Sequence, residues 1–255
     1  MIKEALEYLV SLKRPTTVNV NGRAYSTERL TPVEEPTADT IGVTTLSALI
    51  GYVGADCDNL IGGGYVDKLT AHIVSPTRVD LYAPADGDFR VRPRLLRAEP
   101  LLRENPFGRF MSGEEMVIFL QTCFARNAGD WAKVIAVAGN VTDGATREYA
   151  DDGVSQAVTA RVGVATKADV AMPNPVRLAP FRTFPEIEQP LSSFVFRAKS
   201  GGADSKPTFA LFEADGGAWR IEAMERISEW LDGTAKVALA PAVDGDETID
   251  LHVIY

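Results

Sequence analysis

The chain has 255 residues, a net charge of −9 and 45% apolar residues, an ordinary globular composition with enough residues for one large domain or two modest ones. The negative charge disfavours phosphate-backbone binding by the protein as a whole, although a local basic patch remains compatible with it. No apolar run approaches the roughly 20 residues of a membrane span. The first residues carry Glu4 and Glu7 inside their apolar pattern, which is not the pattern of a secretory signal.

The chain has two cysteines, Cys57 and Cys123, which are far apart in the sequence. Each lies beside apolar residues at helical spacing, which favours two buried thiols in a reducing compartment over a disulfide or a metal site. We therefore expect a cytoplasmic protein.

The N-terminal region predicts a helix followed by a hairpin. Apolar residues recur at helical spacing from Ile2 to Leu12, and Pro15 ends the pattern. Asn21-Gly22 lies between two strand-like arms, which is typical of a two-residue type I′ turn. An extended connector with Pro32 and Pro36 follows.

A second helix and a second hairpin are predicted next. Thr44 or Thr45 can cap a helix that runs to about Asp58, and Gly62–Gly64 then forms a connector. The ranges 68–74 and 78–82 alternate as two strands around a turn at 75–77.

Residues 83–109 show no regular pattern and contain the only locally basic stretch. Loops of this length are unusual inside a compact domain, so we expect a linker between halves or an arm that lies on a neighbouring molecule. The corresponding division is 1–84, 85–110 and 111–255, with one continuous domain as the alternative. The arginines of the stretch are Arg90, Arg92, Arg94, Arg97, Arg103 and Arg109.

Two capped helices are predicted after this stretch. Ser112 and Glu115 have the spacing of a capping box, and the helix that they open has an apolar face that includes Cys123. Asp130 is expected to cap a further helix over 131–138, closed by Gly139.

The C-terminal half predicts strands and one long helix. Residues 154–164 alternate with the period of a strand, as do 194–197 and 208–214. Asp215 is expected to be the N-cap of a helix that continues to about Gly233. The last residues, 248–255, alternate to the end and are expected to pair in a sheet. Because strands come in hairpins and helices do not alternate with them, the fold class is α+β, a mainly antiparallel sheet with about five helices.

No catalytic motif is present, and no catalytic residue, metal ligand or cofactor is predicted. His72 and His252 each lie in a strand-like segment and are interpreted as structural. Gly216-Gly217 could offer N–H groups to a phosphate, but Glu213 and Asp215 would repel it. We therefore expect a sharp corner whose acidic residues pair with Arg220 or an arginine of the 83–109 stretch. Three acidic clusters, near 86–88, 151–152 and 244–247, could ligate Mg²⁺ or Ca²⁺ but fit solvated turns better.

Several segments resemble a known family. They are ADDGVSQ (150–156), PFRTFPEIEQP (180–190), FVFR (194–197) and ALFEADGGAW (210–219), together with VNGRAYS (20–26). This combination resembles the uncharacterised phage and prophage proteins labelled YfdQ-like. The resemblance implies a phage-encoded cytosolic protein and assigns no site residue.

The leading hypothesis is a non-enzymatic phage accessory protein that forms homo-oligomers, with a scaffold or shell as a variant. The alternative is capture of a small anionic ligand such as a signalling nucleotide, and a weaker one is a metal-dependent hydrolase. Neither a membrane nor nucleic acid is the expected partner. The candidate ligand contacts are Arg92, Arg94, Arg97, Arg182 and Arg197.

Overall fold

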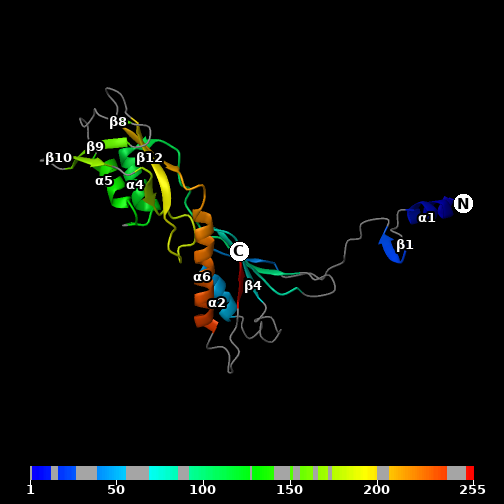
Figure 1. Ribbon diagram of the computed structural model, residues 1–255. Coiled ribbons are helices and arrows are strands. Elements are labelled where there is room, and N and C mark those ends of the chain that lie inside the picture. The colour runs from blue at the N-terminus through cyan, green and yellow to red at the C-terminus, as the bar shows by residue number, and fades with distance from the viewer. Residues whose placement is uncertain are drawn as a thin grey trace. The chain divides into compact units, whose positions relative to one another are not determined.

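The computed structural model divides the chain into two compact units, residues 1–38 with 86–91 and residues 39–85 with 92–255 (Figure 1). None of the described helices combines the length and the apolar character that a membrane crossing requires. The residues that the structure describes are 2–12, 17–26, 39–55, 69–85, 92–126, 128–140, 150–151, 156–162, 166–171, 174–199, 207–239 and 251–255.

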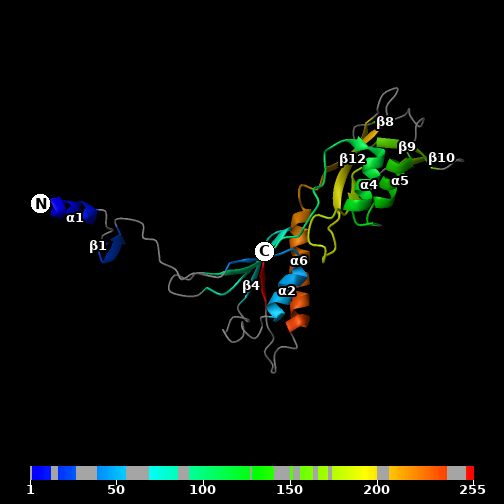
Figure 2. The ribbon, with the colours of Figure 1, turned by 180° about the vertical axis from the view of Figure 1, so that it is seen from behind.

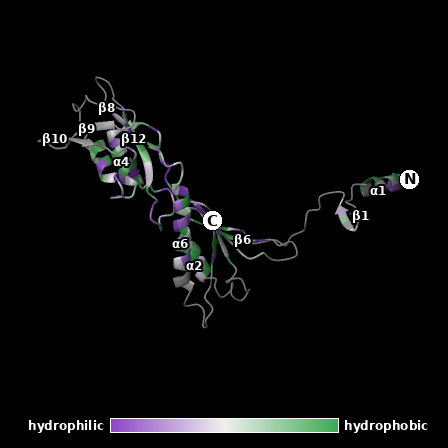
Figure 3. Ribbon diagram, in the orientation of Figure 1, coloured by the Kyte–Doolittle hydropathy of each residue, from purple (hydrophilic) through white to green (hydrophobic). Residues whose placement is uncertain are grey.

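The first unit contains the predicted helix and hairpin. Helix α1 spans Ile2–Leu12, and strands β1 (Thr17–Val20) and β2 (Arg23–Ser26) pair antiparallel. Asn21 (φ 52°) and Gly22 (φ 79°) both have positive φ, as a type I′ turn requires. The hairpin prediction is therefore confirmed. Figure 3 shows hydrophobic and hydrophilic residues on α1.

The second unit contains a mixed five-stranded sheet in the order β14-β4-β5-β6-β3. The central strands are antiparallel, and both edge strands run parallel to their neighbours. Its strands are β3 (Ile41–Val43), β4 (Thr70–Ser75), β5 (Arg78–Tyr82), β6 (Arg94–Ala98) and β14 (His252–Ile254).

Two helices pack on one face of this sheet, as Figures 1 and 2 both show. They are α2 (Leu46–Ala55) and α6 (Trp219–Leu239). Thr45 Oγ1 accepts a hydrogen bond from Ala48 N (3.1 Å), which confirms the predicted cap of α2. The buried core joins residues from 46–98 to residues from 184–251, so the expected boundaries at 84 and 110 do not separate two cores.

A second, four-stranded antiparallel sheet has the order β11-β12-β13-β7 and carries two further helices. Ser112 and Glu115 form the predicted capping box of α4, whose face with Met116, Phe119, Leu120 and Cys123 is buried. The elements are β7 (Met111–Ser112), α4 (Gly113–Cys123), α5 (Trp131–Asn140), β11 (Val176–Leu178), β12 (Ser192–Lys199) and β13 (Thr208–Glu213).

The core under this second sheet is rich in phenylalanine. Phe124 and Phe194 are almost fully buried, and the ring centroids of Phe107 and Phe194 are 5.0 Å apart. Burying one such side chain contributes about 1.5–3 kcal/mol, so this aromatic cluster is a major stabilising element.

A third, small sheet consists of β8 (Ala150–Asp151), β9 (Gln156–Val162) and β10 (Thr166–Ala171), all antiparallel. The four sheets, counting the β1-β2 hairpin, and the five described helices confirm the α+β class with mainly antiparallel pairing. The C-terminal strand also pairs as predicted, because β14 runs parallel to β4.

The arginine-rich stretch differs from the expectation of a linker or an arm, because residues 94–98 form β6 between β5 and β3. Leu96 and Ala98 face the core, whereas Arg97 faces away from it. A register shift between Leu81 and Tyr82 inserts one extra residue into β6. This bulge breaks the alternation that would have identified the strand.

Three helix ends also differ, one of them the end of α6, which lies at Leu239 and not at about Gly233. Helix α6 begins at Trp219, so Asp215 lies ahead of it and accepts a hydrogen bond from Gly217 N (3.0 Å) in the preceding turn. Gly216 (φ 63°) and Gly217 (φ 84°) have positive φ values that a right-handed helix does not contain, so the helix begins after them. Helix α5 continues past Gly139 to Asn140.

Candidate functional site

Residues 99–110 connect β6 to β7 and run beside α4. Gly108, at φ 77°, donates its N–H to Leu211 O (2.8 Å), and Asn105 Nδ2 donates to Phe181 O (3.4 Å). These two hydrogen bonds tie the connecting segment to Leu211 and Phe181, which lie far from it in the sequence. The space left between the segment and α4 is the candidate site.

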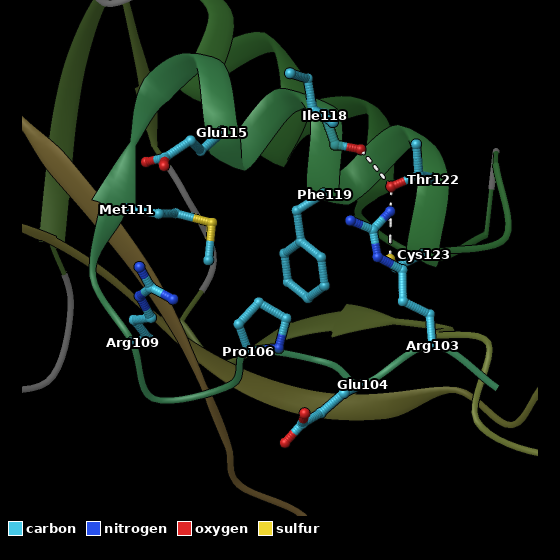
Figure 4. Close-up of a pocket in the computed structure, with 10 residues that line it drawn as sticks. All are labelled: Arg103, Glu104, Pro106, Arg109, Met111, Glu115, Ile118, Phe119, Thr122 and Cys123. Atoms are coloured by element: carbon cyan, nitrogen blue, oxygen red, sulfur yellow. Dashed lines mark hydrogen bonds between the residues drawn. The ribbon is translucent and has the colours of Figure 1, made fainter.

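The space is a pocket of about 560 Å³ (Figure 4). Figure 4 shows Arg109 and Arg103 on opposite sides of the apolar side chains of Phe119 and Pro106. Volumes of about 300–1,000 Å³ are typical of sites for small ligands. The lining residues are Arg103, Glu104, Pro106, Arg109, Met111, Glu115, Ile118, Phe119, Thr122 and Cys123.

A second pocket of about 370 Å³ adjoins the first, because both are lined by Arg103, Thr122 and Cys123. Its walls are apolar at Leu101, Leu102 and Phe181. Asn105 Oδ1 is buried there and accepts no hydrogen bond from any described residue. A buried acceptor of this kind is satisfied by a donor from water or from a ligand.

The charged side chains at the pocket differ in whether they already have partners in the protein. Glu115 accepts hydrogen bonds from Ser112 N (2.8 Å) and Ser112 Oγ (2.9 Å), and these bonds lower its pKa, with a smaller contribution from Arg109. Arg103 and Arg109 are exposed and form no ion pair with another described residue. The two guanidinium groups are therefore available to an anion.

Cys123 has the one thiol in the described residues, and it is 4% exposed. Its Sγ lies 3.5 Å from Thr122 Oγ1, which also donates to Ile118 O (2.7 Å). A nucleophilic thiol requires a neighbouring base, and neither histidine lines the pockets.

Arg182, a predicted ligand contact, lies in a different place. Its guanidinium is 3.8 Å from the centre of the Trp219 ring, donates hydrogen bonds to Glu213 and Ser192, and lies 3.8 Å from Asp215. Burial lowers the pKa of Arg182 to about 10, although Glu213 and Asp215 act in the opposite direction. The acidic corner was expected to pair with Arg220 or an arginine of the 83–109 stretch, and it pairs with Arg182 instead.

The other predicted contacts occupy two further places. Arg94 and Arg97 lie on β6 around Asp80, and Arg92 lies just before that strand. Arg197 lies on β12 of the second sheet. None of the five predicted residues lines either pocket.

Arg103 and Arg109 belong to the arginine-rich stretch, yet the sequence did not separate them from its other arginines. Their position in the sequence relative to the neighbouring elements could have distinguished them. They follow the last residue of the hidden strand β6 and precede the capping box that opens α4.

Metal ligation finds no support in the described residues, where no group of three or more His, Cys, Asp or Glu side chains could hold an ion. The acidic residues 86–88 and 244–247 lie outside the described part of the chain, as do Cys57 and Gly62–Gly64. The side chains of 151–152 lie outside it as well.

No protein-family model matches this sequence, and comparison with curated proteins and with solved structures finds no match.

Proposed function

We propose that this protein acts by binding, without catalysis, and that the pocket beside α4 holds a small ligand with an anionic group and an apolar body. The observation that carries the proposal is the position of Arg103 and Arg109 on opposite sides of an apolar pocket of about 560 Å³. Arginine presents paired N–H donors that match a carboxylate or a phosphate.

The lining of both pockets supports a ligand with two parts. An anionic group at Arg103 would leave the body of the ligand against Phe119 and Pro106 or against Leu102 and Phe181. A nucleotide has this composition, since it joins phosphate to a flat base. A base would also offer N–H donors, which Asn105 Oδ1 needs.

The test is a thermal-shift panel of linear and cyclic nucleotides and of aromatic carboxylates, followed by calorimetry on the compounds that shift the melting temperature. A ligand at one hundred times its Kd stabilises a protein by about 2.7 kcal/mol. We expect Arg103→Gln and Arg109→Gln to abolish the shift, and Arg126→Gln, an exposed arginine outside both pockets, to keep it. A panel without any shift would contradict the proposal.

Self-association is the second candidate, and the first unit favours it. Ile2 (81%), Leu6 (57%) and Leu9 (59%) of α1 are exposed, as are Val18 and Val20 of β1. Helices of this length and isolated hairpins are marginal in water. The C-terminal strand β14 pairs with β4 at the edge of its own sheet, and the support for self-association comes from the exposed apolar residues of the first unit. With the resemblance to YfdQ-like proteins, this supports a phage accessory or scaffold role in the bacterial cytoplasm.

Light scattering during size-exclusion chromatography tests this candidate on the full chain. We expect an oligomer at micromolar concentration that Leu6→Glu with Leu9→Glu converts to monomer, while Lys3→Glu on the polar side leaves it intact. Electron microscopy of the same sample would show whether the oligomer is a shell. A wild-type chain that is monomeric would rule the candidate out.

A further inference from the structure

We propose that the open face of the five-stranded sheet binds single-stranded nucleic acid. The open face is the side opposite α2 and α6, and its central side chains are His72, Arg78, Asp80, Tyr82, Arg94 and Arg97. This proposal does not depend on the pocket beside α4, which lies on other residues.

The strand register places these side chains on one surface. Asp80 on β5 is paired with His72 on β4 and with Arg97 on β6, so the three form one row across the sheet. Arg78 and Tyr82 lie two residues to either side of Asp80 and therefore point the same way. In the described part of the chain, both helices that pack on this sheet cover the other face.

Asp80 is the anchor of this surface, and its side chain is fully buried beneath the arginines. It accepts hydrogen bonds from Arg78 Nη2 (2.6 Å) and Arg97 Nε (2.9 Å), and Arg94 Nη1 lies 3.6 Å away. Burial opposes ionisation of Asp80, but the bonds from Arg78 and Arg97 outweigh it and lower the pKa of Asp80. The carboxylate therefore holds an ordered group of three guanidinium groups.

The held arginines still have donors to offer. Arg97 binds Asp80 through Nε, and Arg94 donates Nε to Thr40 Oγ1 (3.3 Å), which leaves terminal N–H groups of both on a surface that is about one third exposed. Arg92 adds a further exposed guanidinium. Among the described residues, the carboxylates paired with this group are Asp80 and Glu99, so the four arginines outnumber the two described acids.

Two aromatic side chains lie among the charges. The rings of His72 and Tyr82 have centroids 6.5 Å apart, and both are partly exposed. Aromatic side chains interleaved with arginines on an open sheet are the arrangement on which unpaired bases stack while the backbone contacts cations. A small anion fits this surface less well, because sites for small ligands bury most of the ligand.

The net charge of −9 lowers affinity for nucleic acid overall but acts at longer range than these contacts. Contacts to four phosphates of a single strand predict a slope of about −3 for log K against log salt, which is roughly a 50-fold loss between about 50 and 200 mM.

The test is fluorescence anisotropy of the full chain with a fluorescein-labelled oligothymidylate at low salt. Arg92→Glu keeps the Asp80 group intact, because the described contact of Arg92 is with Thr70 Oγ1 (3.5 Å). We expect Arg92→Glu to weaken binding at least tenfold and to lower the salt slope by about 0.7 or more. Tyr82→Leu is expected to cost fivefold or more through lost stacking.

Arg126→Glu is the matched control, since it makes the same charge change at an exposed position away from the sheet. Equal melting temperatures of the variants establish that they are folded. The proposal is overturned by absence of binding at about 50 mM salt, by an equal effect of Arg126→Glu and Arg92→Glu, or by adenosine monophosphate competing as well as the oligonucleotide. The last result would identify a small-nucleotide site.

Discussion

The arginines of residues 90–109 divide into two groups with different surroundings. Arg94 and Arg97 lie on β6 and share the buried carboxylate of Asp80, whereas Arg103 and Arg109 follow that strand and line the pocket beside α4 without an ion pair to a described carboxylate. The comparison shows that a local excess of arginine does not by itself mark a ligand site. What distinguishes the groups is whether the fold supplies a buried carboxylate.

Arg182 also pairs with carboxylates, and its side chain is more buried than those of Arg94 and Arg97. Its replacement should therefore have the largest effect on stability. Arg182→Met leaves Glu213 and Asp215 without their cation and Trp219 without the guanidinium on its ring. Removing one partner from a buried charge group costs about 3 kcal/mol. Urea unfolding should show this loss, with Arg182→Lys in between because lysine keeps the charge but loses the paired donors. A midpoint equal to that of the wild type would place Arg182 outside the core.

Asp80→Asn should have the next largest effect. The change removes the charge that three arginines share, but those arginines are about one third exposed and water compensates in part. We expect a loss of about 2 kcal/mol in the free energy of unfolding. Asp232→Asn, at an exposed position of α6, is the control and should change the stability little.

The contribution of Asp80 should also depend on pH. Its pKa in the folded protein is lowered, chiefly by hydrogen bonds from Arg78 and Arg97 acting against burial. The stabilisation is therefore present above the unfolded-state pKa of about 3.9 and is lost as pH falls through the folded pKa. The stability difference between wild type and Asp80→Asn should be constant near neutral pH and shrink below about pH 4. A difference that grows on acidification would contradict this assignment.

The smallest effect on stability is expected at the pocket. Arg103→Gln and Arg109→Gln remove exposed charges without a described partner, so each should change the free energy of unfolding by less than about 0.5 kcal/mol. Calorimetry should nevertheless show lost ligand binding. A large destabilisation would mean that these arginines hold the connecting segment in place, and the contrast with Asp80 would disappear.

Local features of the fold were predictable, because neighbouring residues determine them. The Asn21-Gly22 turn, the capping box at Ser112 and Glu115, and the buried face of α4 all follow from spacing within a few residues. Each depends on hydrogen bonds or side-chain contacts made inside one turn or one helix.

Features that depend on distant contacts were not predictable. The bulge in β6 interrupts the alternation of polar and apolar residues that would have predicted a strand. The partners of Arg182, which are Glu213 and Asp215, lie about thirty residues further along the chain. The pocket exists because Asn105 is fixed to Phe181 and Gly108 to Leu211. Nothing in the local pattern of residues 99–110 indicates those partners.

The most direct test of the account is the NMR signal of the arginine side-chain Nε–H groups, recorded while adenosine monophosphate is added. We expect the signals of Arg103 and Arg109 to exchange rapidly with water in the free protein and to move on titration. The Nε–H signal of Arg97, which donates to Asp80, and that of Arg182, whose Nε is buried, should be protected and stay in place. Movement at Arg182 or Arg97 with none at Arg103 and Arg109 would contradict the account.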